Sequence, residues 1–171
     1  MANSILLVRV ILAFAIVGLI LVWWTGGIFS SPEENLIGSI LGMRDGFNQQ
    51  DAGDVLVHCS ENFKESEYFL DLASFRGALL RIFLSQRDRS DGSFLWQALV
   101  EEKEIEIELD GPAETARVAM VSAPIRFVKR KSLASKPVWV LRIDAQAYKE
   151  EDGRWRFIQA RFKTISGRRP F

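Results

Sequence analysis

The sequence has very few of the residues from which disulfides and most metal sites are built. Its 171 residues include one cysteine, Cys59, and one histidine, His58. A single cysteine excludes a disulfide within the chain. It does not indicate whether the protein resides in an oxidising or a reducing compartment. One His and one Cys form a zinc site only if carboxylates complete it. We therefore expect neither a bound metal nor a cofactor.

The sequence also lacks an excess of either charge. It holds 22 Lys and Arg residues against 22 Asp and Glu residues. Domains that bind nucleic acid carry a basic surface, so nucleic acid is not an expected partner. Internal repeats and low-complexity tracts are absent too. The length suits one globular domain with an appendage.

A complete catalytic set is also missing. His58 and Cys59 are the one pair with the residue types of a base and a nucleophile. Neighbours in sequence rarely face each other, and no third residue that would orient them is identifiable. We interpret the pair as a histidine at a helix end beside a buried cysteine, and we predict no catalytic residue.

What the sequence does have is a long apolar run over residues 5–24, whose one charge is Arg9. A helix rises about 1.5 Å per residue, so this run would span roughly 30 Å, the thickness of a bilayer's hydrocarbon core. Arg9 would reach the headgroups on one side, and Trp23 and Trp24 would lie at the other interface. We predict a transmembrane anchor over 1–27 and a tether over 28–32.

A cleaved signal peptide is the alternative for this run, with 25–27 as a small-residue cleavage site. The lack of Lys or Arg before Arg9, and of an A-x-A site, favours the anchor. Positive charge precedes the run, whereas Glu33 and Glu34 follow it. The positive-inside rule then predicts a cytoplasmic N-terminus and an exported domain, periplasmic or extracellular.

Beyond the tether, the patterns predict helices over 32–50, around 55–59 and over 67–87. The first has an apolar stripe with Leu36, Ile40 and Phe47 at helical spacing. In the third, Arg76 falls inside the apolar stripe. Its guanidinium would pair with a carboxylate such as Asp144, reach water, or bind an anionic ligand.

The second half of the chain changes to a period of two, which is typical of strands. Glu104, Glu106 and Glu108 alternate with apolar residues, which predicts a half-exposed strand. Cross-strand arginines would pair with these acids, the candidates being Arg117, Arg126 and Arg142. A long strand over 115–129 would bend at Pro124. The basic connector 129–131 reads as a solvated loop.

The clearest pattern is a hairpin over 136–164. Small and apolar residues alternate with polar ones along its first strand; they are Trp139, Leu141, Ile143, Ala145 and Ala147. Asp152-Gly153 marks the turn, and Trp155 and Phe157 follow on the return strand. We assign the folded domain to 33–165 and a C-terminal tail to 166–171.

Three helices followed by long strands, with residues 46–51 ending the first helix and 152–155 turning the last hairpin, resemble the nuclear transport factor 2-like superfamily, the cystatin-like α+β cone. The resemblance implies an α+β fold: three N-terminal helices packed on a strongly curved antiparallel sheet that encloses a pocket. Some members of that superfamily use the pocket for catalysis and others bind partners, so the fold does not fix the function. Secretion-system assembly factors with one membrane helix share the layout.

For such a pocket the candidate ligand-binding residues are Arg76, Tyr68, Asp144 and Tyr148. The polar face that holds Asp144 is alternatively a solvated or dimer-forming outer face. We predict a membrane-anchored, non-catalytic interaction or assembly module of an envelope complex, with a protein partner or a second copy on the sheet. The alternative is a cone-pocket isomerase, dehydratase or hydrolase, or a protein that holds a small apolar molecule.

Overall fold

The computed structural model describes residues 30–132 and 136–171. The chain divides into two units, Met1–Ser31 and Pro32–Phe171, and the second holds the described helices and strands. The predicted anchor, with Arg9, Trp23 and Trp24, lies outside the described residues. Across 30–132 and 136–171, no helix combines the length and the apolar character needed to cross a bilayer.

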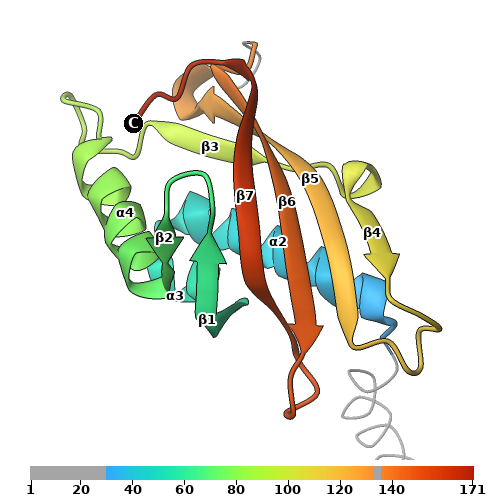
Figure 1. The fold of residues 1–171 in the computed structure, drawn as a ribbon. Helices are drawn as coiled ribbons and strands as arrows, with labels where there is room; N and C mark the ends of the chain where they lie inside the picture. The colour runs from blue at the N-terminus through green and yellow to red at the C-terminus, as the bar shows by residue number, and fades with distance from the viewer. Residues whose placement is uncertain (1–29, 133–135) are drawn as a thin grey trace, which may run out of the picture. The chain divides into compact units, whose positions relative to one another are not determined.

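A seven-stranded sheet forms the body of the second unit, in the order β2-β1-β7-β6-β5-β3, with β4 also paired to β5. Helices cover one side of this curved sheet, and α2 crosses beneath the long strands (Figure 1). The strands are β1 (Cys59–Glu65), β2 (Leu70–Asp71), β3 (Trp96–Leu99), β4 (Glu106–Leu109), β5 (Val118–Lys129), β6 (Trp139–Lys149) and β7 (Trp155–Gly167). The predicted α+β architecture with helices packed on the sheet is confirmed.

The sheet is mixed, so the prediction of an antiparallel sheet is wrong at one pair of strands. β1 runs parallel to β7, whereas the other paired strands are antiparallel. β1 begins at Cys59, the last residue of the segment around 55–59 where we expected a helix. Parallel pairing joins residues far apart in sequence, here Cys59 with Phe157, and no local pattern reports it.

The first two helices are α2 (Pro32–Gln49) and α3 (Ala52–Leu56). Asp51 starts α3, because its carboxylate accepts the N–H groups of Gly53 and Asp54 at 2.7 and 3.1 Å. Gly46 allows the two helices to approach, since a Cβ there would lie 2.9 Å from the Cβ of Asp54. Both helices agree with the predicted ones to within a few residues.

The third helix, α4 (Leu72–Ser85), begins five residues later than predicted. Residues before it form a turn and β2, and Asp71 caps the helix by accepting the N–H of Ser74 at 2.7 Å. Its inward residues include Phe75, Leu79 and Phe83, which are buried. Arg76 is exposed, so its predicted place on the core side is wrong.

The predicted hairpin forms from β6 and β7, and Gly153 turns the chain at φ +80°. Its alternation separates two faces of the sheet. On the inner face, toward the helices, β6 places Trp139, Leu141, Ile143, Ala145 and Ala147, which are all buried. The outer face carries Asp144 and Tyr148 from the same strand.

Pro124 lies inside β5 without ending it. Two strands share one edge of β5: β4 pairs with Ala119–Ser122 and β3 with Arg126–Lys129. Pro124 lies in the interval between the two, where no strand of the described residues pairs with it on that edge. The missing N–H of proline is therefore tolerated there. At the predicted bend, the strand that pairs with this edge of β5 changes from β4 to β3.

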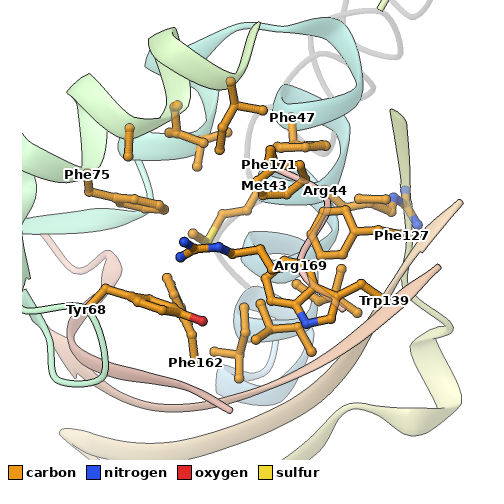
Figure 2. Close-up of a pocket in the computed structure, with 18 of the residues that line it drawn as sticks. Met43, Arg44, Phe47, Tyr68, Phe75, Phe127, Trp139, Phe162, Arg169 and Phe171 are labelled. Atoms are coloured by element: carbon orange, nitrogen blue, oxygen red, sulfur yellow. The ribbon is translucent and has the colours of Figure 1, made fainter. Parts of the chain in front are cut away.

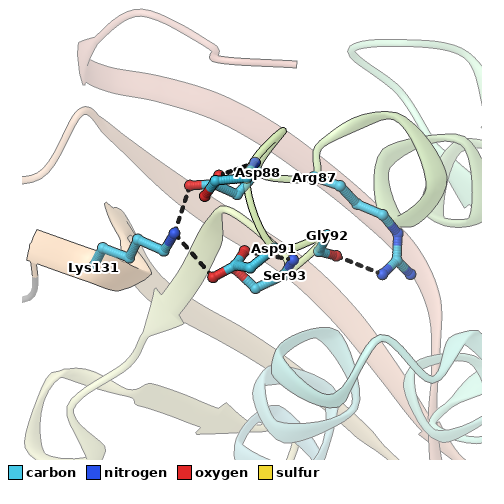
Figure 3. Close-up of polar contacts among 7 residues, drawn as sticks. Arg87, Asp88, Asp91, Gly92, Ser93 and Lys131 are labelled. Carbon is cyan, nitrogen blue, oxygen red and sulfur yellow. Dashed lines mark hydrogen bonds and ion pairs between the residues drawn. The ribbon is translucent and has the colours of Figure 1, made fainter.

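The basic connector after β5 is held by acids from the loop that follows α4. Lys131 Nζ lies 2.7 Å from Asp88 Oδ2 and 3.1 Å from Asp91 Oδ2 (Figure 3). These contacts and a hydrogen bond from Ser90 hold the pKa of the Asp88 carboxyl well below its usual value. The connector is thus a fixed contact between β5 and the loop, rather than a free basic segment.

Candidate functional site

A cavity of about 660 Å³ opens between the inner face of the sheet and helices α2 and α4. This volume falls inside the roughly 300–1,000 Å³ range of ligand pockets. Most of the wall is apolar; from the helices come Ile40, Met43, Phe47, Phe75, Leu79 and Ile82, and from the strands Ile125, Phe127, Trp139, Leu141, Ile143 and Phe162. The alternation of β6 faces the apolar half of that strand toward this space.

One end of the cavity is walled by a cluster of aromatic rings. Phe127 stacks on Trp139 with ring centroids 5.0 Å apart, and Phe47 meets Phe127 edge to face at 5.5 Å. Phe171 packs against Phe127 and Trp139 at 5.6 Å each (Figure 2). These contacts bring the segment after β7 back over the inner face. The predicted domain end at 165 is therefore wrong, since β7 reaches Gly167 and the half-buried Phe171 packs against the core.

The charged residues at the cavity wall are all arginines. Arg44, Arg81 and Arg169 line it, and no described lining residue is Asp, Glu or His. Arg44 forms two hydrogen bonds with its neighbour Asp45, at 2.8 and 3.0 Å. The cavity is thus apolar, with cationic groups at its margin.

Tyr68 and Arg169 meet across the cavity. The guanidinium carbon of Arg169 lies 5.0 Å from the centroid of the Tyr68 ring. Both residues line the cavity, and Figure 2 shows the guanidinium directed inward between Tyr68 and Phe75. This pair places a hydroxyl and a guanidinium on an otherwise largely apolar wall.

Glu65 fixes the turn that carries Tyr68. Its side chain is buried, with 2% of the residue exposed, and its carboxylate accepts three backbone N–H groups. The donors are Glu67 at 2.8 Å, Tyr68 at 2.7 Å and Phe162 at 3.0 Å. Because these bonds join the end of β1 to β7, Tyr68 is held on a rigid support.

Of the four predicted pocket residues, the structure places only Tyr68 at the cavity. Arg76 points to solvent, because the inward stripe of α4 passes through Phe75 instead. Asp144 lies on the outer face, where it accepts hydrogen bonds from Ser122 and Arg142 at 2.9 Å each. Tyr148 is on the same outer face.

The packing of His58 and Cys59 fits a structural role for both residues. The His58 imidazole packs on α2 at Gly42, where a Cβ would lie only 2.5 Å from Nε2. Burial lowers the pKa of His58, and burial raises the pKa of the Cys59 thiol to about 12. Cys59 is therefore a thiol at neutral pH and a poor nucleophile. Within the described part of the chain, no three His, Cys, Asp or Glu side chains converge as a metal site would require.

Sequence reasoning missed the three arginines of the site, Arg44, Arg81 and Arg169, and also Phe171. Arg44 directly follows Met43 of the predicted apolar stripe, so its long side chain reaches the cavity margin. Arg169 and Phe171 belong to the tail, to which we assigned no contact. The one local hint was an aromatic residue at the end of a polar segment.

Neither a protein-family model nor a curated protein matches the chain. Solved structures do match. A cystatin-like protein of unknown function from Nostoc punctiforme gives a TM-score of 0.57 at 10% identity, over 76% of this chain and 88% of that one. An NTF-2-like protein of unknown function from Shewanella oneidensis gives 0.53 at 14% identity, over 77% and 98%.

A ketosteroid isomerase-like protein from Erwinia carotovora atroseptica gives a TM-score of 0.52 at 12% identity, over 75% of this chain and 92% of that one. Identities this low are evidence of a shared fold and not of a shared activity. The chain described here therefore has the cystatin-like, NTF2-like α+β fold.

Proposed function

We propose that this protein is a non-catalytic cone domain that holds a small, largely apolar molecule in the cavity between its sheet and its helices. The observation that supports this most is the composition of the cavity wall. Aromatic and aliphatic side chains make up most of it, and its described residues include no carboxylate or imidazole. Such a wall favours binding by apolar burial over proton transfer.

An enzyme of the isomerase or dehydratase kind is the alternative, since one structural neighbour is named ketosteroid isomerase-like. General acid–base catalysis needs a titratable group within hydrogen-bond reach of the substrate. At this cavity the described candidates are Tyr68 and the arginines, and arginine does not deprotonate in proteins. A holding role fits these groups better than turnover.

Binding is tested with a neutral, apolar fluorophore such as N-phenyl-1-naphthylamine, added to the full-length chain in lipid nanodiscs with empty nanodiscs as the blank. Ala78 of α4 lines the cavity, whereas Ala73 of the same helix is exposed. Ala78→Trp should fill the cavity and lower probe affinity about tenfold or more, while Ala73→Trp should leave it unchanged. Far-ultraviolet circular dichroism checks that both variants fold. Equal binding by the two variants would refute the holding role.

We further propose that residues 1–27 anchor the domain to a membrane, with Arg9 and the tryptophans Trp23 and Trp24 at opposite interfaces and the folded C-terminal domain exported. The apolar run and its flanking charges support this. A protease added to intact cells or spheroplasts should digest the domain if it is exported, and alkaline carbonate should leave the protein in the membrane fraction. Release into the soluble fraction, with an N-terminus near residue 28, would indicate a cleaved signal peptide.

A second candidate function is an interaction module that uses the outer face of the sheet, with a protein partner or a second copy. Met120 and Tyr148 are 49% and 39% exposed there, on the adjacent strands β5 and β6. Met120→Glu should reduce self-association in sedimentation experiments on the full-length chain. Val57→Glu, at an exposed apolar residue outside the sheet, is the control. A monomer at all concentrations would remove the homodimer from consideration.

A further inference from the structure

The cationic groups at the cavity differ in how far their charge is already neutralised. Arg44 is paired with the adjacent carboxylate of Asp45, with Nε 2.8 Å from Oδ1. In the described part of the chain, no carboxylate pairs with Arg81 or Arg169. The cavity therefore has two arginines available to a ligand, on opposing supports: α4 and the segment after β7.

Arg169 is the better placed of the two. Its guanidinium lies over the Tyr68 ring and points into the cavity (Figure 2). A guanidinium carries five N–H donors in its plane, and stacking on a ring leaves their edges open. In the described structure none of these donors bonds to a protein acceptor. The arginine thus presents an unused, planar donor edge to the cavity.

The fold holds Arg169 from both sides. At the end of β7, Gly167 has φ +77°, and a Cβ there would lie 2.1 Å from the Val138 oxygen, so the residue must be glycine. The next N–H, of Arg168, donates to the same oxygen at 3.2 Å. Phe171 then packs into the aromatic cluster beyond. Arg169 lies between two fixed points, which reduces the entropy lost when it binds a ligand.

We propose that the molecule held in this cavity is an amphipathic monoanion, an aromatic carboxylate or a close analogue, whose charged group pairs with Arg169. Its flat apolar body would lie against Phe75 and Phe162, and the Tyr68 hydroxyl would offer a further donor. Arginine and carboxylate match in geometry and form two parallel hydrogen bonds. The inference rests on the proposed holding function and names the class of ligand.

Two isosteric probes separate charge from apolar burial: 2-naphthoate and its neutral counterpart 2-naphthamide. We expect the full-length chain in nanodiscs to bind the naphthoate about tenfold or more tightly than the amide, measured by titration calorimetry against empty nanodiscs. Arg169→Gln should remove this preference by weakening naphthoate binding about tenfold. Its affinity for the amide should stay within about twofold.

Arg168→Gln is the matched control, because it removes the same charge from the neighbouring residue, which does not line the cavity. It should keep the preference for naphthoate. Equal affinities for the two probes in the wild type, or equal loss in both variants, would overturn the assignment to Arg169 while leaving the holding function intact. Failure of naphthamide, naphthoate and N-phenyl-1-naphthylamine to bind at all would refute both proposals.

Discussion

The two faces of the sheet differ in whether their charged side chains are paired with opposite charges. On the outer face, acids and bases alternate and neutralise one another: Arg142 Nε lies 2.9 Å from Asp144, and Arg126 pairs with Glu104 through both carboxylate oxygens. On the inner face the described lining includes arginines and no acids. The difference suggests that the outer charges serve folding and solubility, whereas Arg81 and Arg169 at the cavity are left for a ligand.

The largest expected effect comes from placing an acid on each face at neighbouring positions of β6. Leu141 is buried on the inner face, and Val140 is half-buried on the outer face. Leu141→Asp should destabilise by about 5 kcal/mol, because it removes a packed side chain and buries a carboxyl without a partner. Val140→Asp should cost less than about 1 kcal/mol. Denaturant unfolding followed by circular dichroism measures both, and similar losses would contradict the distinction between the faces.

Glu65 is an instructive exception, since it is an acid on the inward side of β1. Its carboxylate accepts hydrogen bonds from three backbone N–H groups. Glu65→Ala should lower the free energy of unfolding by about 3 kcal/mol, because buried donors are left without an acceptor. Glu67→Ala is the control; its exposed pair with Arg161, at 3.3 Å, should contribute less than about 1 kcal/mol. A small effect at Glu65 would mean that water replaces the carboxylate.

Two phenylalanines allow a comparison between a ring packed against the core and a ring exposed to solvent. Phe171 contacts four aromatic rings, whereas Phe69 is 88% exposed. Phe171→Ala should destabilise by about 1–2 kcal/mol through lost ring contacts. Phe69→Ala should change the stability by no more than about 0.5 kcal/mol. Thermal unfolding of the two variants would show whether the segment after β7 is part of the core.

The smallest effect concerns pH and belongs to the outer face. Arg126 lowers the pKa of Glu104. For Asp144, burial alone would raise the pKa, but hydrogen bonds from Arg142 and Ser122 outweigh it and lower the pKa. A carboxyl with a lowered folded-state pKa stabilises the fold above its unfolded pKa of about 4. That contribution is lost as the pH falls through the folded-state pKa.

The denaturation midpoint should therefore begin to fall as the pH drops through the unfolded pKa of about 4, and it should keep falling as the pH passes the lowered folded-state pKa values. Arg126→Gln should flatten this dependence, because Glu104 then titrates near its ordinary pKa. An unchanged profile in the variant would show that the pair with Glu104 contributes nothing to stability. Arg154→Gln is a suitable control, since its contact with Asp152 is long, at 3.9 Å.

Much of the fold could be predicted because its elements are encoded locally. The stripe of α2 and the alternation of β6 repeat over many residues, and Asp152-Gly153 specifies a turn. Phe69 placed the predicted start of α4 too early, and the apparent apolar stripe also included Leu80 and Leu84. All three are exposed in the structure. Counting them as inward rotated the expected face of the helix toward Arg76 and away from Phe75.

The site was harder to predict because its parts are joined by long-range contacts. The alternation of β6 separates Asp144 from the apolar residues, but the sequence does not say which side of the strand encloses the cavity. Parallel pairing of β1 with β7 carries Tyr68 to the segment that holds Arg169. Residues about a hundred positions apart thus form one polar pair, for which no spacing rule exists.

The single cysteine gives this molecule a natural reporter of its own opening. Cys59 is the first residue of β1, is buried, and has no second thiol in the chain with which to react. A disulfide reagent can label it only when a local opening exposes its thiol. The labelling rate of the unmodified protein then measures how often the structure around the start of β1 opens. A ligand that joins Tyr68 to Arg169 should slow that rate, so occupancy of the cavity can be timed without introducing any label.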